Sequence, residues 1–118
     1  MRGAIDSAGI PTTVISGQGT HRVFQCTSGE QADTVFENLV IRNGENAIGG
    51  GMYNDFSSPT LTNCTFTGNA AGDDGGGMSN HVGSPMLTDC TFRNNSAIFS
   101  GGGMHNESSH PILTRCTF

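Results

Sequence analysis

Three chemically capable side chains recur at a constant interval along the chain: Asp55, His81 and Glu107, each directly after an asparagine. If residues at this interval lie in successive layers of a stack, neighbours in this trio would be about 5 Å apart and the two carboxylates about 10 Å apart. Imidazole and carboxylate both bind divalent metals, and a carboxylate pair can hydrolyse a glycosidic bond. Because inverting hydrolases hold their carboxylates only roughly 6.5–9.5 Å apart, the simpler interpretation is an exposed loop of mixed charge. We therefore assign no catalytic residue and no cofactor.

A second set, Tyr53, Ser79 and His105, shares the same interval and immediately precedes the asparagines. Tyr53 would provide a stacking platform for a sugar, so this set forms a possible ligand face. The alternative is an ordinary polar face of a strand.

The remaining acidic and basic residues support fewer activities. Asp73 and Asp74 could contribute to a calcium site, but one acidic pair cannot supply the six or more oxygen ligands that calcium takes. A lyase acting on acidic polysaccharides would need a positioned base, yet the chain has no lysine, and Arg93 and Arg115 fall at different places in the repeat.

The four cysteines, Cys26, Cys64, Cys90 and Cys116, are too far apart in the sequence to match a CxxC motif. The last three follow the interval of the trio, whereas Cys26 does not and belongs to a different column. Side chains stacked in parallel have poor geometry for a disulfide or for tetrahedral metal ligation. We expect buried free thiols that act as small apolar side chains.

These spacings belong to a tandem repeat. Residues 49–66 align without a gap to residues 75–92 and 101–118, and each copy contains GGGM, an asparagine, a proline and the sequence CTF. The period is about 26 residues, within the range of roughly 20–50 residues that is typical of a solenoid, whose units bury their apolar faces against neighbouring units. The predicted structural columns are Asn54, Asn80 and Asn106; Cys64, Cys90 and Cys116; and Phe66, Phe92 and Phe118. Asn69 and Asn95 begin a further column.

Short strands suit this repeat better than helices, because glycine, β-branched and aromatic residues are too frequent for an apolar helical stripe. We predict three strands in each coil, for example residues 76–80, 85–88 and 90–92. The sharp bend near Asp89 requires a left-handed backbone, which Asn63 and Asp89 tolerate better than Arg115 does.

The predicted fold class is therefore all-β: a right-handed parallel β-helix of about four coils. One continuous domain is expected, with irregular coil in residues 1–33 and regular coils in residues 34–118. The last copy stops at Phe118 without a polar cap. We expect either further coils beyond it, so that the chain is a fragment, or self-association through the open coil ends.

Composition limits the partners. Leu, Ile, Val and Phe make up 23 of 118 residues, whereas 18 Gly, 13 Thr, 11 Ser and 10 Asn favour strands joined by tight turns. The net charge of −5, with arginine as the only strongly basic residue, argues against nucleic acid and anionic membranes. No apolar run reaches the roughly 20 residues needed to cross a membrane, and residues 1–10 do not resemble a signal peptide.

The segments GGGM (75–78), FTGN (66–69) and FRNN (92–95) resemble the repeats of chlamydial polymorphic outer-membrane proteins. GGGMYN and SPTLTNCTF resemble still more closely the repeats of exported proteins of environmental bacteria. The resemblance is strong over residues 34–118 and weak over the first 33. It implies a right-handed β-helix passenger or adhesin without fixed catalytic residues; methionine after the glycines and the lack of a transporter barrel depart from the pattern.

Two functions follow as expectations. The first is a non-catalytic structural or adhesive module of an exported bacterial surface protein, located outside the cell. End-to-end assembly into a fibre is one form that this module could take. The alternative is a carbohydrate-binding or polysaccharide-degrading β-helix that contacts glycans or a host cell surface.

Overall fold

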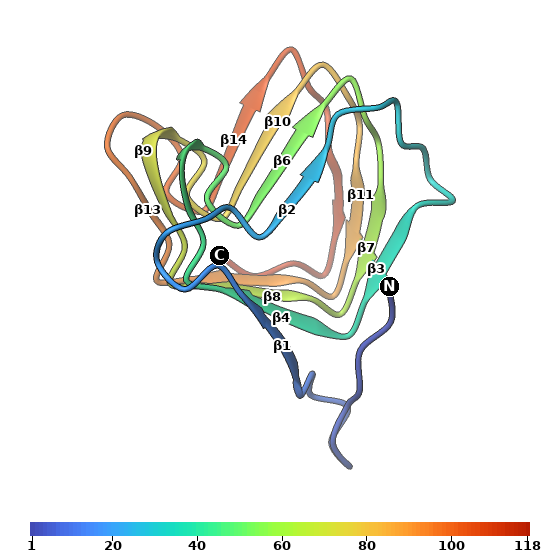
Figure 1. Cartoon of the computed structure of the whole chain (residues 1–118). Coiled ribbons are helices and arrows are strands. Elements are labelled where there is room, and N and C mark those ends of the chain that lie inside the picture. Colours follow the sequence, from blue (N-terminus) through green and yellow to red (C-terminus); the bar gives the residue numbers. More distant parts are fainter.

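The computed structural model describes all of residues 1–118 and consists of strands and connecting turns, wound into a right-handed parallel β-helix of about four coils (Figure 1). Strands of successive coils lie over one another, and every pairing between named strands is parallel. The predicted fold class is confirmed.

Four sheets run along the helix axis. Sheet 1 contains β1 (Thr13–Ser16), β4 (Leu39–Arg42), β8 (Thr65–Thr67) and β12 (Thr91–Arg93). Sheet 2 contains β2 (Phe24–Cys26), β6 (Met52–Asp55), β10 (Met78–His81) and β14 (Met104–Glu107). Sheet 3 contains β3 (Val35–Glu37), β7 (Thr60–Thr62), β11 (Met86–Thr88) and β15 (Ile112–Thr114). Sheet 4 contains β5 (Glu45–Ile48), β9 (Ala70–Asp74) and β13 (Ser96–Ala97).

The three strands predicted for each coil are present as sheets 2, 3 and 1, and sheet 4 adds a fourth. Its strands occupy a segment for which no strand was predicted. In Figure 1 this segment forms a lobe beside sheet 2. Its strands have the sequences ENAI, AAGDD and SA, with Ile48 as the single β-branched residue and no aromatic one. Because such residues signal a strand, pairing with the neighbouring coil decides the conformation of this segment.

The register of the repeat is confirmed by the pairing of β10 with β6 and β14, in which Met78 lies between Met52 and Met104. Phe66 likewise pairs with Phe92. The first coils depart from this interval. The step from Val35 to its partner Thr60 is shorter than the repeat, and the step from Cys26 to its partner Asn54 is longer.

Two local features turn the chain. Asn63, Asp89 and Arg115 adopt left-handed conformations with φ of 51°, 55° and 51°, which places the predicted bend between sheets 3 and 1. At Gly50 the backbone passes so close to the carbonyl of Ala70 in the next coil that any side chain would collide with it. This close approach explains why glycine stands there.

The core consists of inward columns, one residue from each coil. Met52, Leu61, Phe66, Met78 and Leu87 are completely buried. Each such side chain contributes about 1.5–3 kcal/mol relative to an exposed one. Because a column side chain is covered only when a coil lies on each side of it, stability depends on stacking.

Candidate functional site

A pocket of about 150 Å³ lies on the outer face of sheet 2, beside the lobe formed by sheet 4. We call it the sheet 2 pocket; it is lined by Ile48, Tyr53, Asp74, Ser79, His81, His105 and Glu107. All three residues of the predicted ligand face line it, together with His81 and Glu107 of the predicted acid and imidazole trio. The structure therefore brings most of the predicted residues together.

The predicted ligand face forms the centre of this pocket. Tyr53, Ser79 and His105 are in register on β6, β10 and β14. Ser79 is 3% exposed, and its hydroxyl forms no hydrogen bond within the protein.

Arg22 covers one side of Tyr53, with the guanidinium carbon 5.0 Å from the ring centroid. Its N–H groups donate to the carbonyls of Ile48 and Gly49 and to the side chains of Gln25 and Asn46. Burial lowers the pKa of Arg22. This contact was not predicted, because the spacing of Arg22 and Tyr53 does not match the repeat.

The trio Asp55, His81 and Glu107 is in register, but only its first two members bind each other. His81 Nδ1 lies 2.6 Å from Asp55 Oδ1, and the Phe56 ring meets the His81 ring edge-on. No group of three His, Cys, Asp or Glu side chains lies close enough to hold a metal ion. The contact with Asp55 holds the His81 ring in place. Of the trio, His81 and Glu107 line the sheet 2 pocket, and Asp55 does not.

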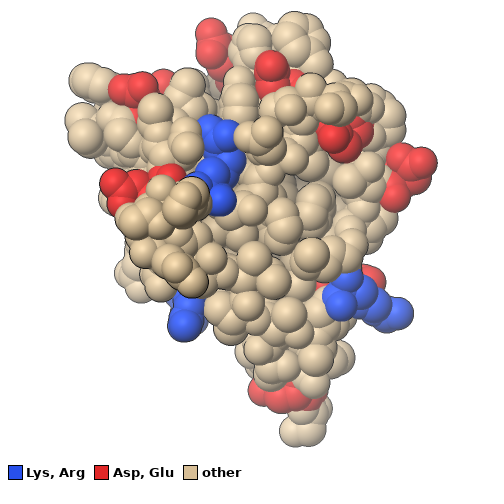
Figure 2. Space-filling model, viewed as in Figure 1, with Lys and Arg blue, Asp and Glu red and all other residues tan.

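The pocket carries negative charge. Burial raises the pKa of Tyr53, and the carboxylates of Asp55 and Glu107 raise it further, whereas Arg22 lowers it. Asp74 adds a carboxylate from sheet 4, while its predicted calcium partner Asp73 does not line the pocket. Figure 2 shows acidic groups around much of the visible surface and basic groups only in small separate patches.

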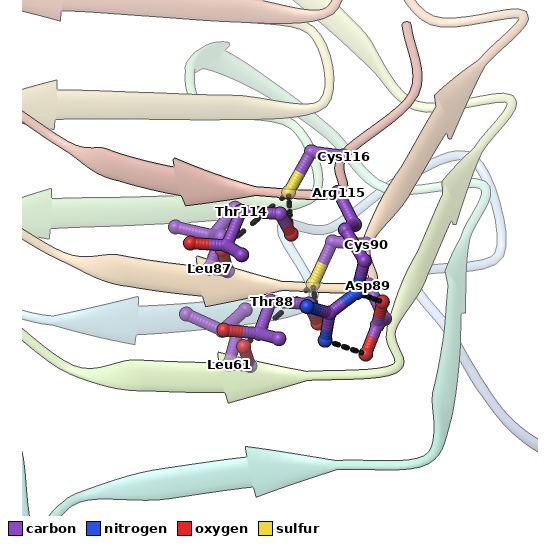
Figure 3. A network of polar contacts seen from close by, with 8 residues as sticks. All are labelled: Leu61, Leu87, Thr88, Asp89, Cys90, Thr114, Arg115 and Cys116. Atoms are coloured by element: carbon purple, nitrogen blue, oxygen red, sulfur yellow. Dashed lines mark hydrogen bonds and ion pairs between the residues drawn. The ribbon is translucent and has the colours of Figure 1, made fainter.

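The cysteine column forms a separate polar network without a ligand site (Figure 3). Cys90 Sγ donates to the carbonyls of Leu61 and Thr88 at 3.8 and 3.4 Å, and Cys116 repeats the pattern one coil later. Cys64 and Cys90 are buried, as expected for this column, whereas Cys116 is only partly buried; Cys26, outside the column, is buried as well. Contact with the Cys64 thiol, together with burial, raises the pKa of Cys90, and burial raises the pKa of Cys26 to about 11. The protonated thiols of Cys26 and Cys90 are therefore poor nucleophiles and poor metal ligands.

Two asparagine ladders run along the axis and brace the coils. Asn54 Nδ2 donates to Asn80 Oδ1 at 2.8 Å, and Asn80 Nδ2 donates to Asn106 Oδ1 at the same distance. Asn69 Nδ2 donates to Asn95 Oδ1 at 3.1 Å. Because the amides bond to each other, these residues are structural.

A second hollow, of about 540 Å³, lies at the open end of the aromatic column. The Phe92 ring stacks between those of Phe66 and Phe118, at centroid distances of 4.5 and 4.8 Å. Phe118 and Met104 line the hollow. We call this surface the end face; it comprises Met104, Ile112, Leu113, Cys116 and Phe118.

Comparison of the chain with protein-family models, curated proteins and solved structures finds no match. The structure also contains no helix long and apolar enough to cross a membrane.

Proposed function

We propose that this chain is a non-catalytic structural module of an exported bacterial surface protein, and that it assembles end to end into a fibre. The observation that carries the proposal is the end face. It presents, in register, the side chains that every internal coil buries against its neighbour. In β11 and β12, Leu87 and Phe92 are 0% and 2% exposed, whereas Leu113 and Phe118, one coil later, are 42% and 61% exposed.

The occupant proposed for the end face is the first coil of a second copy. Ile15, Phe24 and Phe36 stand at the foot of the columns that end in Phe118, Met104 and Leu113, and they pack against the core from below. Stacking head to tail would continue each column with an apolar side chain. Since the two contacting surfaces differ and lie at opposite ends of the coil axis, the contact repeats along that axis and extends into a fibre.

At the lower edge of sheet 3, formed by β3, the first residues of the chain oppose this assembly. Gly3 N–H donates to the carbonyl of Glu37, and Glu37 N–H donates to that of Met1, so residues 1–3 already occupy the lower edge of β3. A second copy must displace them to pair its β15 there. The lower edges of β1 and β2 have no such strand across them.

The exported setting is supported by the GGGM and FxxN repeats and by the burial of the thiols. Cys26, Cys64 and Cys90 are buried, and burial shields a thiol from oxidation outside the cell. Cys116, the most exposed of the four, lies on the end face and would be covered by stacking.

Sedimentation velocity over a wide concentration range, with electron microscopy of the same samples, tests the assembly. We expect filaments whose length increases with concentration. Replacing Leu113 and Phe118 by Asp should abolish them. The matched control replaces Ile98 and Phe99 by Asp, because these exposed apolar residues lie outside the end face.

Deletion of residues 1–12 should lower the concentration at which filaments form, since it frees the edge of β3. A monomer at every concentration would show that something other than a second copy covers the end face. Filaments that survive the Leu113 and Phe118 substitutions would place the contact elsewhere. Either result overturns the proposal.

A further inference from the structure

The outward column of sheet 2 has a ring, a small side chain and a ring in three successive coils: Tyr53, Ser79 and His105. Neighbouring strands are about 4.8 Å apart, so Tyr53 and His105 are separated by about 9.6 Å of backbone spacing. In the inward column, each coil supplies a ring, and the rings stack at 4.5 and 4.8 Å. The space above Ser79, between Tyr53 and His105, is therefore tall enough to hold one additional ring.

The Ser79 hydroxyl is the second observation that indicates a ligand. It lines the pocket, its residue is only 3% exposed, and no protein group bonds to it. The hydroxyl is not sealed off from solvent, since Asn54 Oδ1 is the one buried side-chain polar atom without a partner, and it is therefore free to bond to a molecule in the pocket. A ligand hydroxyl placed over Ser79 would supply the missing partner.

The walls of the pocket are suited to a polyhydroxylated ring. Asp74 and Glu107 present carboxylates, which accept hydrogen bonds from hydroxyl groups, and His81 is held in place by Asp55. Ile48 adds an apolar contact. A sugar ring combines hydroxyls at its edge with C–H groups on its faces, and the faces would pack against Tyr53 and His105.

Charge and size narrow the ligand further. Acidic sugars would meet Asp74 and Glu107, while the guanidinium nearest to Tyr53, that of Arg22, already donates to four protein groups. The volume of about 150 Å³ is below the roughly 300–1,000 Å³ of pockets for drug-sized ligands. It is sufficient for a single ring, but not for several sugar units side by side.

We propose that the sheet 2 pocket binds one uncharged sugar ring of a glycan, seated over Ser79 between Tyr53 and His105. This binding activity goes beyond the scaffold role, and it does not depend on end-to-end assembly. In a fibre, the same pocket would be repeated along the outer surface and would bind multivalent glycans with increased avidity.

A glycan array of neutral oligosaccharides, with polygalacturonate as the acidic polymer, tests the proposal on the full chain. We expect binding to neutral glycans and none to polygalacturonate. Ser79→Phe should reduce binding at least tenfold, because its own ring fills the pocket. The matched control Ser84→Phe places the same ring on an exposed loop and should have no effect.

His105→Ala covers the case in which Ser79→Phe does not fold, since His105 is only partly buried and its removal leaves the core intact. It should also weaken binding at least tenfold. Preference for polygalacturonate, or neutral binding that neither variant reduces, would overturn the assignment of this pocket while leaving glycan binding as an activity. Binding to no glycan would overturn both. Sedimentation of the same variants reports on assembly separately.

Discussion

Cys26 lies in register below Asn54, at the place where an asparagine would continue the ladder of Asn54, Asn80 and Asn106. As a result, Asn54 Oδ1 is buried and has no hydrogen-bond partner, although Asn54 Nδ2 donates to Asn80. The ladder therefore stops at Asn54, and the side-chain oxygen of Asn54 receives no hydrogen bond from the coil below. An unpaired buried acceptor is a local weakness that a donor from below would remove.

Cys26→Asn is expected to stabilise the protein by about 1 kcal/mol, because its side-chain N–H would reach Asn54 Oδ1 in the geometry of the ladder above. Urea unfolding measures the change, with an unaltered slope showing that the two states are otherwise the same. Cys26→Ala is the control, since it removes the thiol without adding a donor and should not stabilise. If Cys26→Asn were no more stable than Cys26→Ala, continuity of the ladder would not limit stability.

Phe92→Ala should destabilise the fold by roughly 3–5 kcal/mol, the range for removal of a buried aromatic side chain. Phe92 is stacked between two rings, so its loss opens a cavity and removes both ring contacts. Phe118→Ala, measured where the protein is monomeric, should lower the free energy of unfolding far less, because Phe118 is exposed on the end face. Equal losses for the two variants in a denaturant titration would contradict the role of stacking.

Gly50→Ala should destabilise the protein by about 1–3 kcal/mol or more, because the new methyl group would collide with the carbonyl of Ala70 in the next coil. Gly72→Ala is the matched comparison in sheet 4. There the nearest atom to an added methyl is Ala47 Cα at 3.6 Å, an ordinary contact. Gly72→Ala should be neutral or stabilising by up to about 1 kcal/mol, through reduced freedom of the unfolded chain. Thermal unfolding distinguishes the two.

Acid should weaken the bend between sheets 3 and 1. Arg115 donates to both carboxylate oxygens of Asp89, at 2.7 and 2.9 Å, and this hydrogen bonding lowers the pKa of Asp89 below 3.8. A depressed pKa means that the contribution is present above pH 3.8 and is lost as the pH falls through the folded-state pKa. Both side chains are exposed, so the effect is small.

Asp89→Asn tests this pair, since asparagine tolerates the same left-handed backbone. The variant should lose less stability than the parent between pH 5 and pH 2, as followed by melting temperature. Asp33→Asn, at an exposed site without such a pair, should retain the acid sensitivity of the parent. A parental acid response in Asp89→Asn would remove Asp89 as its source.

Much of the fold could be predicted because the length of a repeat indicates which residues of neighbouring coils pair with each other. The interval from Phe66 to Phe92, and from Asn54 to Asn80, places these residues over one another in any parallel solenoid of that period, and the structure confirms both pairs. The bend at Asp89 was predictable because few residues tolerate a left-handed backbone. Sheet 4 was not predicted, since Ala70–Asp74 lacks strand-forming residues and depends on its neighbours for pairing.

The sequence by itself determined the relations along the axis: which side chains stack, which columns face inward, and that Tyr53, Ser79 and His105 share an outer face. Only the tertiary structure decided the relations across the coil. It brought Asp74 and Ile48 into the same pocket as Ser79, and it placed Arg22 against Tyr53. The physical reason is that the length of the repeat determines which residues of successive coils lie over one another. Contacts across a coil depend instead on how turns of irregular length fold back onto a sheet.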